Sequence, residues 1–309
     1  MTDRPADRGP GAGRRALVVV LALLLGLAGC GLGSGPAADG PDAPRTQRTP
    51  FDQALYDRLP AAVRGAGRIR VATDASYPPA SSFADDGRTI VGFEPDLAAA
   101  LGRVLGVELV FVRMDFRDTL PALQAGQVDV IIAAMTDTVE RQATVDFIDY
   151  FSAGTTIIVQ RGNPHAILDL RDLCGQVVAA EEATIQVELL TRTQASCGDR
   201  PIVVRLYADN DTALLELRTG RAAAVLNDYP PAARLTSDPS TRADFQLAST
   251  VQYEPGFYGI AVGKDQARLR DALREALSRL LASGEYDAVL AEWGVSSGGL
   301  ETAGLNGGT

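Results

Sequence analysis

A mostly apolar run rich in valine and isoleucine begins at Val128 and ends in small residues at Ala133 and Ala134. Such a run is typical of a strand that is buried on both faces of a sheet. Two threonines and Arg141 follow, so hydroxyls, free backbone N–H groups and a fixed cation meet where the strand ends. Ligands of open α/β sheets bind at the carboxyl ends of strands, and a guanidinium bonds both oxygens of a carboxylate. The pattern favours an anion site; an exposed arginine that opens a surface helix is the alternative.

Strand and helix patterns alternate in the segment before this run. A short β run over 68–73 ends in a turn rich in proline, and apolar residues at helical spacing predict a helix over 95–105. A strand over 107–112 and a short helix closed by Gly126 follow. This order predicts an α/β fold, with a parallel or mixed sheet that carries helices on its faces.

A second alternation of strands and helices follows a β run over 155–160. The pattern then returns to a strand over 258–262 and to helices over 269–281 and 286–293. The residues from Ser296 onward are polar and rich in glycine, which predicts a disordered tail. The elements expected in the second series are a helical turn at 168–173, strands at 176–180, 203–207, 223–226 and 245–250, and helices at 181–194 and 209–219.

The N-terminus has the pattern of an export signal. Arginines precede an apolar run over 16–28, which is too short to span a bilayer comfortably and is typical of a secretory signal peptide. The run ends in the sequence LAGC, which resembles a bacterial lipobox and makes Cys30 the expected lipidated residue; a chance cysteine is the alternative. We expect a signal peptide over 1–29, a flexible tether over 30–50 and a short helical lead-in over 51–65.

Composition narrows the classes of function. The chain has 309 residues, 46% hydrophobic and 22% charged, which suits one large or two medium globular domains. Its formal net charge of −10 argues against nucleic acid as a partner, because phosphate binding requires basic surfaces. The sequence shows no Ser-His-Asp set, zinc-ligand spacing, GxGxxG pattern or P-loop. These absences weigh against a hydrolase, a metalloenzyme and a nucleotide binder, and we expect neither a metal nor a cofactor.

Two further cysteines, Cys174 and Cys197, follow in the body of the chain. Disulfides persist in exported proteins, and the number of remaining cysteines is even. We therefore predict that the two residues pair, with free buried thiols as the alternative. Closing a loop of this length would stabilise the fold by about 3 kcal/mol.

Several stretches, taken in order, resemble the family 3 solute-binding proteins of bacterial ABC importers, which capture polar amino acids. The resemblance runs from about Arg68 to Gly294. The stretches that show it are Val71–Pro79, Gly92–Leu97, Leu123–Asp129, Met135–Arg141 with Asp146 and Phe147 five residues on, Tyr258–Val262 and Gly284–Trp293.

The resemblance implies a periplasmic-binding-protein fold of type II, in which two Rossmann-like lobes close on ligand about a hinge of two segments. Lobe 1 would comprise residues 66–155 and 253–297, and lobe 2 would comprise residues 156–252. The disordered tail would then cover residues 298–309.

The resemblance also implies that one amino acid zwitterion is bound by both lobes, which makes closure depend on ligand. Arg141 would bind the α-carboxylate, helped by Thr136 and the backbone near Ala134. Thr184 lies at a predicted helix start, where free N–H groups and the helix dipole favour an anion. Asp228 matches the acid that binds the α-ammonium group.

The remaining candidate residues concern the ligand's flanks and side chain. Tyr77 and Phe116 match the two rings of lobe 1 that sandwich the ligand, and they could instead be ordinary core aromatics. Asp74, which could also be a turn residue, and Glu181 match positions near the ligand side chain. Asp228 has an alternative too, since it could cap the helix that follows it.

Two acids without an added base favour a cationic side chain such as that of arginine or lysine, ahead of a neutral polar one and an acidic one. Asp74 occurs in family members that bind cationic and neutral amino acids, whereas Glu181 replaces a lysine of the glutamine-binding relatives. The sequence departs from the family pattern at Ala80–Ser82 and at Glu182–Ala183, where the pocket would be reshaped.

The resemblance therefore implies a binding protein rather than an enzyme. It would be a monomer anchored by lipid on Cys30 to the extracytoplasmic side of the cell membrane, and it would deliver a free amino acid to an ABC permease. One alternative is an enzyme of the same fold, such as a cyclohexadienyl dehydratase, with Glu181 as its acid or base. Another alternative is a sensory amino-acid-binding module.

Overall fold

The computed structural model of the protein describes residues 48–309. The expected signal peptide, Cys30 and the tether up to residue 47 lie outside the described residues. The helical lead-in falls within them and forms two helices, α1 (Gln53–Arg58) and α2 (Ala61–Ala66). No helix within residues 48–309 combines the length and the apolar character that crossing a bilayer requires.

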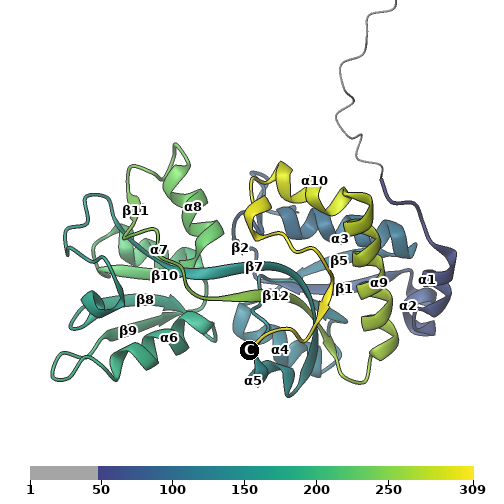
Figure 1. The fold of residues 1–309 in the computed structure, drawn as a ribbon, viewed down its shortest axis with the longest axis horizontal. Helices are drawn as coiled ribbons and strands as arrows, with labels where there is room; N and C mark the ends of the chain where they lie inside the picture. Colours follow the sequence, from purple (N-terminus) through teal and green to yellow (C-terminus); the bar gives the residue numbers. More distant parts are fainter. Residues whose placement is uncertain (1–47) are drawn as a thin grey trace, which may run out of the picture. The chain divides into compact units, whose positions relative to one another are not determined.

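The described residues form a mixed sheet that extends through two lobes (Figure 1). In lobe 1, β1 is parallel to β5 and β6; in lobe 2, β8 is parallel to β9 and β10. A small antiparallel sheet of β2, β3 and β4 stands apart. The strands of the two lobes are β1 (Arg68–Thr73), β2 (Ser76–Tyr77), β3 (Ser81–Phe83), β4 (Ile90–Val91), β5 (Glu108–Arg113), β6 (Val130–Ile131), β8 (Val177–Glu181), β9 (Val203–Tyr207), β10 (Ala224–Asp228) and β11 (Phe245–Leu247), which pairs with β7.

Two long strands connect the lobes. β7 (Val145–Gln160) and β12 (Tyr253–Gly263) are antiparallel to each other, and Figure 1 shows them passing from one lobe into the other. In lobe 1, β12 also pairs with β6; in lobe 2, β7 also pairs with β10. A hinge made of two strands allows the lobes to rotate relative to each other while the strand pairing within each lobe is kept.

Helices cover the sheet in both lobes. The longest, α9, belongs to lobe 1 although it lies near the end of the chain, because β12 returns the chain to that lobe. The helices are α3 (Phe93–Leu105), α4 (Phe116–Gln124), α5 (Val139–Gln142), α9 (Ala267–Ser283) and α10 (Glu285–Glu292) in lobe 1, and α6 (Ile185–Gln194), α7 (Asn210–Arg218), α8 (Tyr229–Ser237) and the 3-10 turn Leu170–Leu173 in lobe 2.

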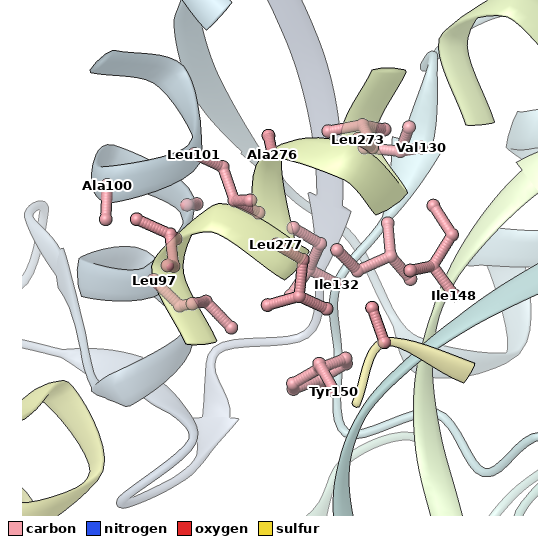
Figure 2. Packing of buried hydrophobic residues seen from close by; sticks show 14 of the residues in the cluster. Leu97, Ala100, Leu101, Val130, Ile132, Ile148, Tyr150, Leu273, Ala276 and Leu277 are labelled. Atoms are coloured by element: carbon pink, nitrogen blue, oxygen red, sulfur yellow. The ribbon is translucent and has the colours of Figure 1, made fainter. Parts of the chain in front are cut away.

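The core of lobe 1 forms where α3 and α9 pack on the sheet (Figure 2). Leu97 and Leu101 lie one turn apart on α3, as do Leu273 and Leu277 on α9, so each helix buries one apolar stripe. These side chains pack with Ile132, which directly follows β6, and with residues of the strands, and all of them are almost completely buried. Burying each leucine stabilises the fold by about 1.5–3 kcal/mol. This packing holds the strands of lobe 1 in place.

The disordered tail predicted over 298–309 is wrong. Strand β13 (Gly304–Leu305) pairs antiparallel with β7. Beyond it, the Gly308 N–H donates to Asp137 Oδ2 at 2.8 Å, and the Gly307 N–H donates to Asp149 Oδ2 at 3.1 Å. A Cβ at Gly304 or Gly308 would overlap with these aspartates, so the glycines permit close docking of the tail.

The predicted disulfide is confirmed, since Cys174 and Cys197 are bonded in lobe 2. The bond joins the end of the 3-10 turn to the end of α6, across a sequence separation of 23 residues. It restrains the helix that begins beside the candidate site.

Candidate functional site

A small pocket with a cavity volume of about 30 Å³ lies between the two lobes. This volume is enough for a water molecule and far below the roughly 300–1,000 Å³ of most small-molecule sites, so the lobes are tightly closed around the lining residues. Every residue that the sequence analysis proposed as a ligand contact lines this pocket, and three others join them. The lining residues are Asp74, Tyr77, Phe116, Ala133, Ala134, Thr136, Arg141, Glu181, Thr184, Ile185, Gln186 and Asp228.

The pocket gathers these residues because parallel strands end there. β1 is followed directly by Asp74, and β8 and β10 end in Glu181 and Asp228. Phe116 begins α4 three residues after Arg113, the last residue of β5, and Thr184 precedes α6. The carboxyl ends of the strands in the two lobes thus face one cleft, as expected for ligand sites of open α/β sheets.

Arg141 connects the two lobes through hydrogen bonds. Its Nη1 donates to the Thr136 carbonyl at 2.8 Å, and its Nη2 donates to the Ala183 carbonyl of lobe 2 at 2.9 Å. The guanidinium also lies over the Phe116 ring, 5.7 Å from its centroid. Burial lowers the pKa of Arg141, but an arginine remains charged at neutral pH. A fixed cation whose donors meet only neutral carbonyls is well suited to a carboxylate.

Asp228 carries the opposite charge and is buried in the same pocket. Its Oδ2 accepts from the hydroxyls of Tyr258 at 2.7 Å and Tyr77 at 3.1 Å, and its Oδ1 accepts from Gln186 Nε2 at 2.8 Å. Burial raises the pKa of Asp228, and these donors oppose the rise. The carboxylate does not cap α8, although the residue occupies the N-cap position, so the capping interpretation is wrong.

Asp74 and Glu181 form an acidic end of the pocket. The Ser76 N–H donates to Asp74 Oδ1 at 2.9 Å, so Asp74 does shape the local turn. Its Oδ2 and the Oε1 of Glu181 are buried and have no hydrogen-bond partner in the described part of the chain. Burial, reinforced by the charge of Asp74, raises the pKa of Glu181 to about 9. Within residues 48–309, no group of three or more His, Cys, Asp or Glu side chains is arranged as metal ligands.

The two predicted rings have both a core role and a site role. Phe116 packs into the core beneath β1 and β6, and it also supports the guanidinium of Arg141. Tyr77 packs at the edge of the main core of lobe 1, while its hydroxyl reaches Asp228 in lobe 2. Neither interpretation excludes the other.

Three residues that shape the site were not identified in the sequence analysis. Tyr258 and Gln186 hold the carboxylate of Asp228, and Glu94 fixes the loop after β6. Glu94 accepts from the Ala134 N–H at 2.6 Å, so this N–H is engaged inside lobe 1 and is not directed at a ligand. Ala134 therefore lines the pocket without offering its own N–H, contrary to the contribution expected near this residue.

Residues 69–296 match the bacterial extracellular solute-binding proteins, family 3, and the chain belongs to this family. The arginine-binding protein ArgT of Corynebacterium glutamicum is 30% identical over 256 residues, which cover 80% of this chain and 81% of that protein. An ancestral arginine-binding protein, solved with arginine bound, has a TM-score of 0.69 and 34% identity, covering 74% of this chain and 98% of its own.

A third similar structure is an ancestral amino acid-binding protein described as a precursor of cyclohexadienyl dehydratase. Its TM-score is 0.67 and its identity 30%, with 75% of this chain and 97% of its own covered. Together these similarities confirm the predicted two-lobed α/β fold class and the predicted family.

Proposed function

We propose that the protein is the substrate-binding component of an ABC importer and that it captures a free cationic amino acid between its lobes. The observation that carries this proposal is the placement of opposite charges. Arg141 from lobe 1 and Asp228 from lobe 2 line one pocket, together with two more acids. A zwitterion can satisfy the first two residues, and a cationic side chain can satisfy the acids.

The balance of charge favours a cationic side chain. Once Arg141 has bound the α-carboxylate and Asp228 the α-ammonium, Asp74 and Glu181 remain, each with an unpartnered buried oxygen. Leaving such atoms unpaired costs about 1–3 kcal/mol each, so a ligand that supplies donors recovers this cost. A ligand with an acidic side chain would be repelled by these acids and should bind most weakly. A ligand with a neutral polar side chain should bind more tightly than an acidic one and more weakly than a cationic one. Relatives that are named arginine-binding proteins support this order.

Closure on the ligand follows from the division of these residues between the lobes. Arg141 reaches the Ala183 carbonyl, and Tyr77 reaches Asp228, so the described arrangement already brings the lobes into contact. A ligand held at one end by lobe 1 and at the other end by lobe 2 stabilises this closed arrangement over an open one.

An enzymatic function is the second candidate because Glu181 resembles a buried general acid and one similar structure is a precursor of a dehydratase. The similar proteins favour binding instead, since relatives and neighbours that cover most of this chain are named arginine-binding proteins. We propose that the protein does not turn over prephenate or arogenate.

The remaining proposals concern location and assembly. We propose a monomer that is anchored by lipid on Cys30, faces the extracytoplasmic side of the membrane and docks on a permease. The lipobox-like sequence supports the anchor, and membership of a family of extracellular solute-binding proteins supports the location.

Calorimetric titration of the mature chain with each of the twenty amino acids and ornithine tests the function. We expect one site per chain, tightest for arginine, lysine or ornithine, and no binding of aspartate or glutamate. Incubation of the same protein with prephenate and arogenate should leave both compounds unchanged. Failure to bind any amino acid, or turnover of either compound, would contradict the proposal.

A further inference from the structure

The acidic end of the pocket is divided between the lobes. Asp74 follows β1 of lobe 1 and is 5% exposed, whereas Glu181 ends β8 of lobe 2 and is 9% exposed. Asp74 Oδ2 and Glu181 Oε1 both lack a hydrogen-bond partner in residues 48–309. Closing the lobes therefore brings two buried carboxyl groups to the same end of one cavity, each with an oxygen available to a ligand.

The charges around this end are mostly negative. Asp115 after β5 and Asp209 and Asp211 at the start of α7 add their repulsion to that of Asp74 at the carboxyl of Glu181. Across the pocket lie Arg141, Asp228 and the hydroxyl of Tyr77. The charged groups of neighbouring elements that act on Asp74 and Glu181 are Arg113, Asp115, Asp209 and Asp211.

The nearby arginines are engaged with other acids. Arg113 lies 3.0 Å from Asp115 and 3.9 Å from Asp74, and Arg117 pairs with Glu182 at the edge of the cleft. In the described portion of the chain, no ion pair includes Glu181. The empty closed pocket thus holds Glu181 without an ion-pair partner. Burial and the surrounding acids raise its pKa to about 9, which corresponds to a protonated carboxyl at neutral pH.

We propose that Glu181 selects between two classes of ligand by its proton: it keeps the proton beside a neutral polar side chain and releases it beside a cationic one. This inference rests on the proposed function. A protonated carboxyl donates a hydrogen bond to a neutral carbonyl oxygen, and an ionised carboxylate pairs with a cation. One pocket can therefore accept both side chains without any movement of the chain.

The sign of the pH dependence follows from the two complexes. The complex with a cation binds one proton fewer than the complex with a neutral ligand. The ratio of the two dissociation constants, neutral over cationic, must therefore rise with pH, by up to about tenfold per pH unit. The rise ends near pH 9, the pKa of the carboxyl without a counter-charge. The protonation state of the empty protein affects both dissociation constants equally, because both ligands bind to the same empty protein. It therefore does not affect their ratio.

Arginine and citrulline are the matched probes. They have similar shapes, but the guanidinium of arginine stays charged at every pH used, whereas the urea group of citrulline is neutral. Dissociation constants for both are measured by calorimetry between about pH 5.5 and 8.5, below the range in which the ligands' amino groups lose their protons. We expect the ratio of constants to rise at least about tenfold over this range.

Two single substitutions serve as test and control. Glu181→Gln removes the titrating group, so the ratio should become independent of pH. Glu182→Gln makes the same chemical change at the next residue, which pairs with Arg117 and does not line the pocket, so the ratio should keep its pH dependence. Thermal melts of both variants establish that they fold.

The outcomes separate this inference from the proposed function. If both ligands bind with a ratio that does not change with pH, the proton-dependent selection is wrong while the binding function stands. Absence of citrulline binding at pH 5.5, with arginine bound, also overturns the selection. If neither arginine nor any other amino acid binds, the proposed function itself fails.

Discussion

At the scale of single residues, the cationic end of the pocket depends on Arg141. Its guanidinium lies on the Phe116 ring and donates to the Thr136 carbonyl, both in lobe 1, so lobe 1 orients it before the lobes close on a ligand. Such preorganisation lowers the ordering cost of binding. Lysine could not reproduce this arrangement, because an ammonium group lacks the planar fork of donors.

We predict that Arg141→Ala raises the dissociation constant for the preferred amino acid at least about 30-fold, since removing one partner of a buried charge pair costs roughly 2–5 kcal/mol. Arg141→Lys should fall between this variant and the wild type. Arg117→Ala removes an exposed arginine at the same cleft and should change the constant only a few-fold. Calorimetric titration provides the measurement, and wild-type affinity in Arg141→Ala would rule out its role.

The candidate residues could be predicted because strand ends and their turns leave a pattern in the sequence. The residues that were missed leave none. Glu94 is completely buried, but a glutamate in a helix is almost always exposed, and only its distant partners Ala134 and Tyr150 reveal its role. Tyr258 and Gln186 reach Asp228 across long separations in sequence, which periodicity cannot show.

At the scale of elements, long periodic segments could be predicted, whereas short ones stabilised by tertiary contacts could not. The apolar stripes of α3 and α9 match the helices expected from the sequence. The tail of residues 298–309 has no apolar period, so its composition indicated disorder. Its order comes from β13 and from side chains of lobe 1, especially Asp149, which accepts from the Gly307 N–H.

The carboxyl of Asp149 should make the stability of the folded chain depend on pH. Burial and the nearby charge of Asp137 raise the pKa of Asp149 to about 7. A carboxyl whose pKa is higher in the folded state contributes its full stability below the ordinary pKa of 3.8 and loses that contribution as pH rises from there to about 7. Asparagine is neutral at every pH and still offers an acceptor to the tail.

We therefore predict that Asp149→Asn melts at a higher temperature than the wild type at about pH 8, and that the difference is clearly smaller at about pH 5. Asp85→Asn removes the same charge from an exposed residue and should show no such change with pH. Thermal melts at both pH values test this. A wild type that is the more stable protein at about pH 8 would contradict the assignment.

At the scale of the whole molecule, closure brings together charges that neither lobe could satisfy alone. The chain carries a formal net charge of −10, and the pocket adds three acids to one arginine, so a cation is attracted both at long range and at the site. Without such a ligand, closing the lobes places Asp74 and Glu181 in one cavity, where each has a buried oxygen with no hydrogen-bond partner among residues 48–309 and the charge of Asp74 repels that of Glu181. The empty molecule should therefore favour an open arrangement, and closure should require a ligand.

We predict that a saturating cationic amino acid reduces the radius of gyration measured by small-angle X-ray scattering, because the ligand joins residues of lobe 1 to residues of lobe 2. It should also stabilise the fold against unfolding, by about 2.7 kcal/mol at a ligand concentration one hundred times the dissociation constant. Aspartate should produce neither effect, and Arg141→Ala should prevent both with the preferred ligand. A ligand that binds tightly in calorimetry but leaves the scattering profile unchanged would show that the lobes are already closed before binding. In that case the acids of the pocket would not oppose closure of the empty molecule.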